Sequence, residues 1–413
     1  MTGVSILQIV HDHPDWTSGG TEIVAHGLAR ALGAQGGVRS TYLGASTSLQ
    51  RPGGVAGELG AQGGDLVIHT GAYDRFTMTR LDGTAWVESM GRVLSRVRPD
   101  VIHLHGLDRI GAEIVPFLRR LVPRTRIVLT LHDYQIICPN DGLLLTVPDG
   151  ARCGGSSPDR CRRCFPDQGA ARHALRRAHL MALLHEVDAF IAPSRFLRDR
   201  FVAWGLDRAR ISILPNAVEA QAAAAEPSRA RRNRFAFFGN VAPHKGILTL
   251  LDATALLKER RVRVGLALHG GLSHPEPAFA QAFEAGLAAA RPLAQHFGPY
   301  ERDEVGALMR QADWIVVPSV WWENAPLVVL EAQAAGRPVI CSGVGGMAEL
   351  VEDGVTGLHV PPGDSRSLAE TMRVAAADPE LWAHLAPTSS DGGHNNFVQA
   401  HMDLYLGLMR VAA

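Results

Sequence analysis

The segment SVWWENAPLVVLEAQAAGRPVICSGVGGMAELVEDG, from Ser319 to Gly354, decides how the second half of the chain is interpreted. It continues an apolar run, DWIVVPS, that is typical of a buried strand. We predict a helix with Asn324 as its N-cap and Pro326 in its first turn, and Gly336 ends it. A buried strand that leads into a helix is the repeating unit of a parallel sheet covered by helices.

Two glutamates of this segment lie eight positions apart. Glu323 is expected at the mouth of the helix and Glu331 about two turns along it, roughly 10 Å apart along the axis. The free amides between them suit an anion such as diphosphate. A nucleotide sugar would fit, with Glu331 accepting from the ribose hydroxyls and Glu323 from the sugar. The alternative is two surface carboxylates on an amphipathic helix. The residues expected around the diphosphate are Asn324, Ala325, Pro326 and Leu327.

Ten short apolar runs alternate with helical patterns along the whole chain, which predicts an α/β fold with parallel sheets covered on both faces. The runs are VSILQIV, DVIHLH, RIVLTLH, AFIAPS, ISILPN, RFAFFGN, VGLALHGG, DWIVVPS, PVICSG and GLHVPPG. Ten strands are many for one sheet, so two doubly wound domains fit better. The Ala-rich, charged stretch from Pro215 to Asn233 is interpreted as the linker. We therefore expect domains at 1–218 and 219–393, with a final helix at 394–413 that packs on either domain, the first being preferred.

The overall composition narrows the class of protein. The 413 residues carry a formal net charge of zero, which argues against binding of nucleic acid through a broad basic surface. The first residues lack the charged start of a signal peptide, and no uncharged apolar run reaches the ~20 residues of a membrane span. A cytoplasmic protein is the expectation, with peripheral contact at the inner membrane face as an addition.

Lysine is rare in this chain. Of 41 basic residues only Lys245 and Lys258 are lysines, so each is a candidate for a compact ammonium that arginine could not replace. Lys258 lies in LLKERR and is interpreted as part of a solvated helix face. Lys245, in the segment GNVAPHKG, is the functional candidate.

An ordered set of motifs resembles glycosyltransferase family 4. SGGTE, LTLHD, APSRF, ILPNAV and GNVAPHKG occur in the family's order, and Glu323, seven residues and Glu331 match its E-x7-E signature. The resemblance implies the GT-B fold, with two Rossmann-like domains facing across a cleft. It also implies transfer of a sugar, with retention, from a nucleotide-sugar donor to a saccharide or lipid-linked acceptor, in polysaccharide or glycoconjugate assembly.

The resemblance also implies roles for single residues. Glu323 matches the residue at the donor sugar, Glu331 the ribose-binding carboxylate, and Lys245 the lysine that meets the diphosphate. A cation at that point would neutralise charge on the leaving group.

His132, at the end of RIVLTLH, resembles the histidine that reaches the transferred sugar. The alternative is a structural histidine in the cleft wall whose hydrogen bonds are all made within the protein. His103 and His105 lie two positions apart in a predicted strand and are expected to share one face of it. Both are expected to be structural, with an acceptor contact as the alternative for His105.

One position departs from the family pattern. Many members carry an arginine near Asn240, and an amide brings no charge. Arg195, in APSRF, is a candidate replacement, and a solvated arginine is its alternative. Gly19 and Gly20 follow the first strand and would let backbone amides approach a phosphate or an acceptor. The chain contains no Asp-x-Asp motif, which fits a mechanism without a catalytic metal and with no catalytic cofactor.

Four cysteines lie in an insert at 138–166, and the last two form a C-x2-C pair, which is typical of half a structural zinc site. Free thiols are the second interpretation, and disulfides or an iron–sulfur site the third. Cys341 is expected in the core. The zinc candidates are Cys138, Cys153, Cys161 and Cys164.

The helix after the insert carries Arg172, Arg176 and Arg177. It is either a membrane-facing helix or, as we prefer, a plain solvated face. Two rival functions remain for the whole chain: a GT-B sugar-nucleotide epimerase, and a two-domain sugar-binding protein without activity. The sequence leaves the donor base and sugar, the acceptor, the linkage and the oligomeric state open.

Overall fold

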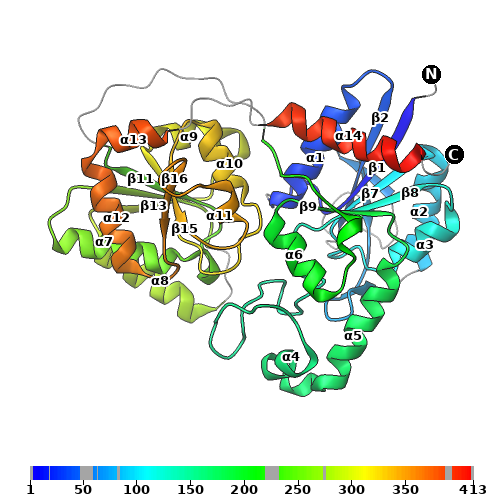
Figure 1. Ribbon diagram of the computed structural model, residues 1–413, viewed down its shortest axis with the longest axis horizontal. Coiled ribbons are helices and arrows are strands. Elements are labelled where there is room, and N and C mark those ends of the chain that lie inside the picture. Colours follow the sequence, from blue (N-terminus) through cyan, green and yellow to red (C-terminus); the bar gives the residue numbers. More distant parts are fainter. Residues whose placement is uncertain are drawn as a thin grey trace. The chain divides into compact units, whose positions relative to one another are not determined.

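The chain divides into two compact units, Met1–Asn216 with Asn396–Ala413, and Ala217–Asn395. This division comes from a computed structural model, which describes residues 3–17, 19–46, 59–62, 64–80, 84–218, 232–272, 276–386 and 393–410. Each unit holds a central sheet flanked by helices (Figure 1). The boundary lies two residues before the expected one, and most of the expected linker lies outside the described residues.

The first unit is built on an eight-stranded sheet in the order β10-β9-β8-β7-β1-β2-β4-β3. All pairs are parallel except β3 with β4. A two-stranded ribbon, β5 with β6, lies apart from this sheet. The strands are β1 (Val4–His11), β2 (Val38–Ser46), β3 (Leu59–Gln62), β4 (Asp65–His69), β5 (Tyr73–Asp74), β6 (Thr79–Arg80), β7 (Val101–His105), β8 (Arg126–Thr130), β9 (Ala189–Ala192) and β10 (Ile211–Ile213).

Within the described residues, seven α-helices belong to this unit. The last of them, α14, comes from the far end of the chain (Figure 1). It is hydrogen-bonded to the sheet through Tyr405 Oη, which lies 2.6 Å from His103 Nδ1 on β7. The unit is therefore assembled from two separate stretches of sequence. The helices are α1 (Gly20–Gly33), α2 (Thr84–Val97), α3 (Ile114–Leu121), α4 (Pro158–Cys164), α5 (Gly169–Leu184), α6 (Arg195–Trp204) and α14 (His394–Arg410).

The second unit is built on a six-stranded, fully parallel sheet in the order β13-β12-β11-β14-β15-β16. The chain moves outward from β11 to β13 and then returns to β14 on the other side of β11. This reversal makes the carboxyl ends of β11 and β14 the place where such sheets bind ligands. The strands are β11 (Arg234–Phe238), β12 (Gly265–His269), β13 (Ala294–Gly298), β14 (Trp314–Val317), β15 (Val339–Ser342) and β16 (Gly357–Val360).

Alternation along β11 gives the second unit two cores. Phe235 and Phe237 face a layer that contains α7, α8, α12 and α13, whereas Ala236 and Phe238 face a layer that contains α9, α10 and α11. Successive side chains of a strand point to opposite faces, so both faces are buried. The helices are α7 (Ile247–Glu259), α8 (Pro277–Ala290), α9 (Val305–Gln311), α10 (Leu327–Ala334), α11 (Met347–Leu350), α12 (Ser365–Ala377) and α13 (Pro379–Leu385).

All ten strands predicted from apolar runs occur, and the predicted α/β class with two doubly wound sheets is confirmed. Four strands of the two sheets, β2, β3, β4 and β13, were not among the predicted ones. Cys341 is fully buried, as expected. Among the described residues, no helix is long and apolar enough to cross a bilayer.

Candidate active site

The predicted Lys245 and Glu323 meet at the strand reversal of the second unit. Lys245 closes a short 3-10 helix, Pro243–Lys245, that follows β11, and Glu323 lies in the loop after β14. Lys245 Nζ is 2.7 Å from Glu323 Oε1, and Ser319 Oγ donates to the same oxygen at 2.7 Å. The two loops that a doubly wound sheet uses for ligands are thus joined by an ion pair.

Only the glutamate of this ion pair is buried. Glu323 is 4% exposed, whereas 27% of the Lys245 side chain is accessible. Burial by itself raises the pKa of the Glu323 carboxyl, but the Lys245 ammonium and the Ser319 hydroxyl outweigh it, and the net pKa is lowered. Glu323 is therefore an anion at neutral pH. Lys245 has three N–H donors and uses one on Glu323, so the ammonium can also serve an incoming anion.

Two glycines allow the loops to approach this closely. Gly246, the residue after Lys245, has φ +71°, and a Cβ there would lie 1.9 Å from the Pro318 carbonyl oxygen. Gly345 has φ +65°, and its Cβ would lie 2.4 Å from the Glu323 carbonyl oxygen. Only glycine tolerates both the backbone conformation and the contact. These positions account for two glycines of the predicted signature regions.

The helix that carries Glu331 is shorter than predicted. Helix α10 begins at Leu327 with Pro326 as its N-cap, and Gly336 follows its end with φ +71°. The prediction of Asn324 as N-cap is wrong, because the Glu323 carbonyl accepts from the Gly346 amide and holds this segment as a loop. Glu331 is the fifth helical residue, about one turn along rather than two. The predicted stop at Gly336 is confirmed.

Glu331 has a partner that sequence reasoning missed. Its carboxylate is buried, and Arg302 NH1 forms a close ion pair with Oε1. Arg302 lies in a short 3-10 helix, Arg302–Glu304, and its side chain is 43% exposed. Nothing in ERDEVG distinguishes this arginine from a surface residue, so only the fold identifies it.

The other residues predicted at the diphosphate lie in the same two loops. Asn240 is exposed and follows the end of β11. Asn324 is buried, while Ala325, Pro326 and Leu327 are partly exposed at the start of α10. The structure thus groups these five residues at the carboxyl edge of the sheet.

In the first unit, Gly20 is the first residue of α1 and Gly19 is its N-cap. A Cβ at Gly19 would lie 2.3 Å from Glu22 Oε2, so the glycine leaves room for this buried carboxylate. Burial raises the pKa of Glu22, although His11 Nε2 lies 3.4 Å from its Oε1 and opposes that effect. Glu22 and His11 were not predicted as site residues.

His132 is partly buried and bonds to a buried histidine, His105. Gln8 Oε1 accepts from His105 Nε2 at 2.8 Å, so a neutral His105 offers Nδ1 as an acceptor. His132 Nε2 lies 3.1 Å from that Nδ1 and donates to it. Burial lowers the pKa of His132 to about 3, which keeps the ring neutral. His132 Nδ1 is then the acceptor nitrogen of the ring.

The predicted common face of His103 and His105 is confirmed, since their ring centroids lie 4.0 Å apart. His103 bonds to Thr130 Oγ1 and Tyr405 Oη, each at 2.6 Å, which agrees with a structural role. Burial lowers the pKa of both histidines well below the ordinary value.

The arginines of the first unit have different surroundings. Arg195 is exposed and is the first residue of α6. Arg176 is buried and donates to the carbonyls of Phe76, Gln135 and Ile136, so its interpretation as part of a solvated face is wrong. Arg177 donates to the Trp204 carbonyl. Two of the three arginines on α5 are thus bound to the protein itself.

The four insert cysteines line one small pocket that is partly open to solvent. None of the five cysteines forms a disulfide. Burial raises the pKa of the Cys138 thiol to about 11 and also raises that of Cys161. The four thiols do not, as placed, form a group whose sulfur atoms could hold one ion. Among the described residues, one group of three has ligand atoms that all lie within 4.8 Å of one another. It consists of His13, His26 and Asp65.

Two family models match successive parts of the chain. "Glycosyltransferase Family 4" matches residues 18–222, and "Glycosyl transferases group 1" matches residues 219–389. Together they span both units. The chain belongs to the family 4 type of glycosyltransferases, as the motifs indicated.

Similar proteins of known name include D-inositol 3-phosphate glycosyltransferase of Mycobacterium sp. (strain JLS), 32% identical over 237 residues, which are 55% of this chain and 51% of that protein. Lipopolysaccharide 1,2-N-acetylglucosaminetransferase of Salmonella typhimurium is 31% identical over 204 residues, 46% of this chain and 53% of that protein. The chain spans about half the length of the curated relatives it matches.

Solved structures share the fold over nearly the full chain. HepE of Anabaena, solved with UDP, superposes with a TM-score of 0.69 at 17% identity, over 98% of this chain and 100% of that one. Sucrose-phosphate synthase of Thermosynechococcus elongatus gives 0.65 at 20% identity, over 98% of each chain. These similarities establish the GT-B fold.

Proposed function

We propose that this chain is a retaining glycosyltransferase that moves a sugar from a nucleotide-sugar donor to an acceptor hydroxyl. The observation that carries the proposal is the Lys245–Glu323 ion pair at the strand reversal of the second unit, with Glu331 on the adjoining helix. A cation and two buried carboxylates at that edge suit a ligand with an anionic centre and hydroxyls on either side. Family membership and the named relatives support the same reading.

The proposed roles follow from the charges. Lys245 binds the diphosphate, and its ammonium stabilises the negative charge that develops as the bond from the anomeric carbon to the diphosphate oxygen breaks. Glu323, an anion held by Lys245 and Ser319, accepts from sugar hydroxyls. Glu331 accepts from ribose hydroxyls in place of Arg302. His132 Nδ1 accepts from a hydroxyl of the transferred sugar.

Retention follows if the acceptor attacks on the face that the diphosphate leaves. The acceptor oxygen then forms the new bond to the anomeric carbon, and its proton passes to a departing diphosphate oxygen. No covalent glycosyl-enzyme forms in this scheme. Trapping such an adduct on any side chain would refute it.

A donor panel tests the proposal. The full chain is incubated with UDP-, GDP- and ADP-linked sugars without an acceptor, and the products are followed by NMR. A transferase slowly releases nucleoside diphosphate and free sugar, initially with the donor's anomeric configuration. An isomerised donor would instead identify an epimerase, and binding without turnover would identify a sugar-binding protein; either result would overturn the proposal.

The acceptor is proposed as a saccharide or a lipid-linked saccharide in polysaccharide or glycoconjugate assembly, at the cytoplasmic face of a membrane. Helix α5 presents Leu175, 70% exposed, beside the exposed Arg172. This pairing of an apolar and a cationic side chain suits an anionic lipid surface. Co-sedimentation with anionic vesicles tests the contact: Leu175→Asp is expected to abolish it, whereas no binding by the unmodified chain would refute it.

We also propose that the cysteine insert binds a structural zinc ion, for which its sulfur atoms must move closer together than the structure places them. Of residues 139–168, only Gly142 and Leu144 are buried, so an apolar core does not explain the order of this segment. A tetrahedral thiolate site would supply the missing cross-link. With Co²⁺ as a probe, an intense thiolate charge-transfer band is expected, and the double variant Cys161→Ser, Cys164→Ser should lose it. Absence of the band in the unmodified chain would refute the site.

A further inference from the structure

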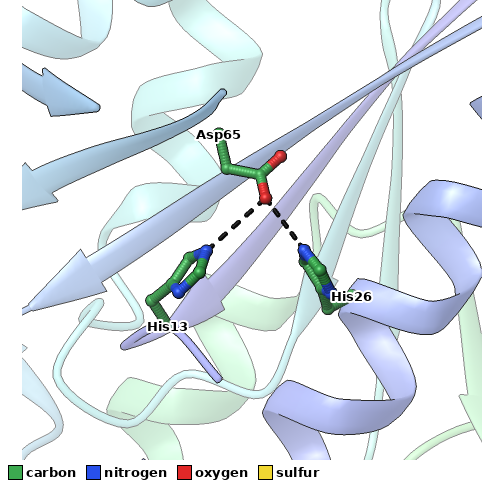
Figure 2. Close-up of side chains that lie close together, drawn as sticks. All are labelled: His13, His26 and Asp65. Carbon is green, nitrogen blue, oxygen red and sulfur yellow. Dashed lines mark hydrogen bonds and ion pairs between the residues drawn. The ribbon is translucent and has the colours of Figure 1, made fainter. Parts of the chain in front are cut away.

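His13, His26 and Asp65 form a group of metal-type ligands apart from the residues discussed above. Asp65 Oδ2 lies 2.8 Å from His26 Nε2 and 3.5 Å from His13 Nε2, and all three ligand atoms lie within 4.8 Å of one another. Figure 2 shows the two rings directed at one oxygen of the carboxylate. The three residues come from the loop after β1, from helix α1 and from the first position of β4.

The loop after β1 reaches this position by a tight crossing. Asp12 adopts φ +64°, a conformation that is uncommon for a residue with a side chain, and the chain then passes over Gly44 of β2. A Cβ at Gly44 would lie 2.7 Å from the Asp12 carbonyl oxygen. The Asp12 carboxylate is held by Thr17 Oγ1 at 2.8 Å and Arg109 NH1 at 3.1 Å. His13 is therefore fixed over β2, beside β4 and α1.

The ligand set matches a borderline-soft divalent ion. Two imidazole nitrogens and a carboxylate oxygen are ligands that Zn²⁺ accepts, with water completing the tetrahedron. The His13 side chain is 3% exposed, while those of His26 and Asp65 are 21% and 27% exposed. His13 is thus held in the protein interior, while His26 and Asp65 leave the site open to an ion and to water. Tyr42 packs edge-on against both rings.

The Asp15 carboxylate lies near Nδ1 of His13, the ring nitrogen that does not face Asp65. The Asp15 amide donates to His13 Nδ1 at 3.2 Å, so the proton of a neutral His13 lies on Nε2. An ion on Nε2 requires this proton to move to Nδ1, and the Asp15 amide then loses its acceptor. Asp15 Oδ2, 3.6 Å from Nδ1, can then accept from it, as carboxylates do behind many zinc-bound histidines.

We propose that His13, His26 and Asp65 bind one divalent ion of the zinc class, which links the loop after β1 to α1 and β4. The ion holds the loop residues Asp12 to Thr17 against α1 and β4. This site is independent of the proposed sugar transfer. The alternative is a plain hydrogen-bonded cluster. In that cluster burial opposes ionisation of Asp65, yet the two histidines lower its pKa to about 2.

The test uses the full chain freed of metal with a chelator and titrated with Co²⁺ and then Zn²⁺. Cobalt on nitrogen and oxygen ligands gives a weak visible spectrum without the thiolate charge-transfer band, which separates this site from the cysteine insert. The variants are His26→Gln and Asp65→Asn, and His179→Gln, an exposed histidine on α5, is the matched control. Circular dichroism confirms that each variant is folded.

The unmodified chain and the control are expected to bind one equivalent at this site. His26→Gln and Asp65→Asn should each weaken binding by more than 100-fold, and Asp15→Ala by about 10- to 100-fold. Zn²⁺ should raise Tm in the control by more than in His26→Gln. If the unmodified chain binds no ion with the nitrogen and oxygen spectrum, the proposal is wrong. Equal binding by the control, His26→Gln and Asp65→Asn would show an adventitious ion only and would equally overturn it.

Discussion

Lys245 Nζ and Glu323 Oε1 lie 2.7 Å apart although 78 positions separate them in the chain. The contact joins the loop after β11 to the loop after β14. The same contact keeps Glu323 charged, because an anionic carboxylate is stable in a buried place only beside a cation. Replacing either residue should therefore change the kinetics of the proposed donor site.

Lys245→Ala is expected to lower kcat/KM by about 100- to 1000-fold, because the charge on the leaving diphosphate loses its main stabilising cation. Asn240→Ala should cost less than tenfold, since an exposed amide brings no charge. Initial rates with the best donor from the panel measure both. Lys258→Ala is the control, because Lys258 Nζ only donates to the Ala289 carbonyl at 2.7 Å. Equal, mild losses from Lys245→Ala and Asn240→Ala would contradict the assignment.

Glu331→Ala is expected to raise the donor KM by about 10- to 100-fold and to change kcat little. A charged hydrogen bond to the ribose contributes about 1.5–3 kcal/mol, and the ribose is not altered during the reaction. Steady-state kinetics over a range of donor concentrations separate the two constants. Glu284→Gln, on the exposed face of α8, should leave both unchanged. A fall in kcat with an unchanged KM would place Glu331 at the reacting sugar instead.

His105→Leu is expected to lower kcat about tenfold with little change in donor KM, because His132 loses the acceptor that fixes its tautomer. His132→Ala should cost at least as much. If His105 acts through His132, the double variant should be no slower than His132→Ala alone. Losses that multiply would show that His105 acts independently, and His179→Gln serves as the histidine control.

The free energy of unfolding is expected to fall as the pH drops from about 6.5 toward 4. Burial lowers the pKa of His401 to about 4 and that of His132 to about 3, whereas an unfolded histidine titrates near 6.5. Between these values the unfolded chain binds protons that the folded chain does not. Each such histidine therefore removes roughly 1.4 kcal/mol per pH unit.

Urea unfolding from pH 7.5 to 5 measures this dependence. His401→Gln, which removes one of the buried rings, should reduce the slope of the free energy of unfolding by about one proton's share. An unfolding free energy that is equal at pH 7 and pH 5 would show that the histidines do not remain neutral in the folded state.

The sequence predicted most strands that carry a continuous apolar run, although it missed β4, DLVIH, whose Leu66, Val67 and Ile68 are buried. Strand β2, VRSTYLGAS, begins with four residues that are not fully buried, so it does not show a continuous apolar run. Strand β13, AQHFG, lies at the edge of its sheet and buries only Ala294 fully. In both strands, neighbours in the fold decide the structure more than the local pattern does.

The candidate site was predicted unevenly for a similar reason. Lys245 and Glu323 stand out because lysine is rare and because the motifs are ordered. Arg302, which pairs with Glu331, and Arg109, which holds Asp12, look like any other arginine in this arginine-rich chain. Their partners lie 29 and 97 positions away, and a separation of that kind is visible only after folding.

Helix α14 has a consequence for how the molecule is made. Its Tyr405 completes the hydrogen bonds of His103, in a strand synthesised about 300 residues earlier. The ribosome must therefore translate the entire second unit before His103 in the first unit can form its hydrogen bond with Tyr405. During that interval a nascent chain would expose part of β7 and its neighbours, and chaperone binding would be expected to concentrate there.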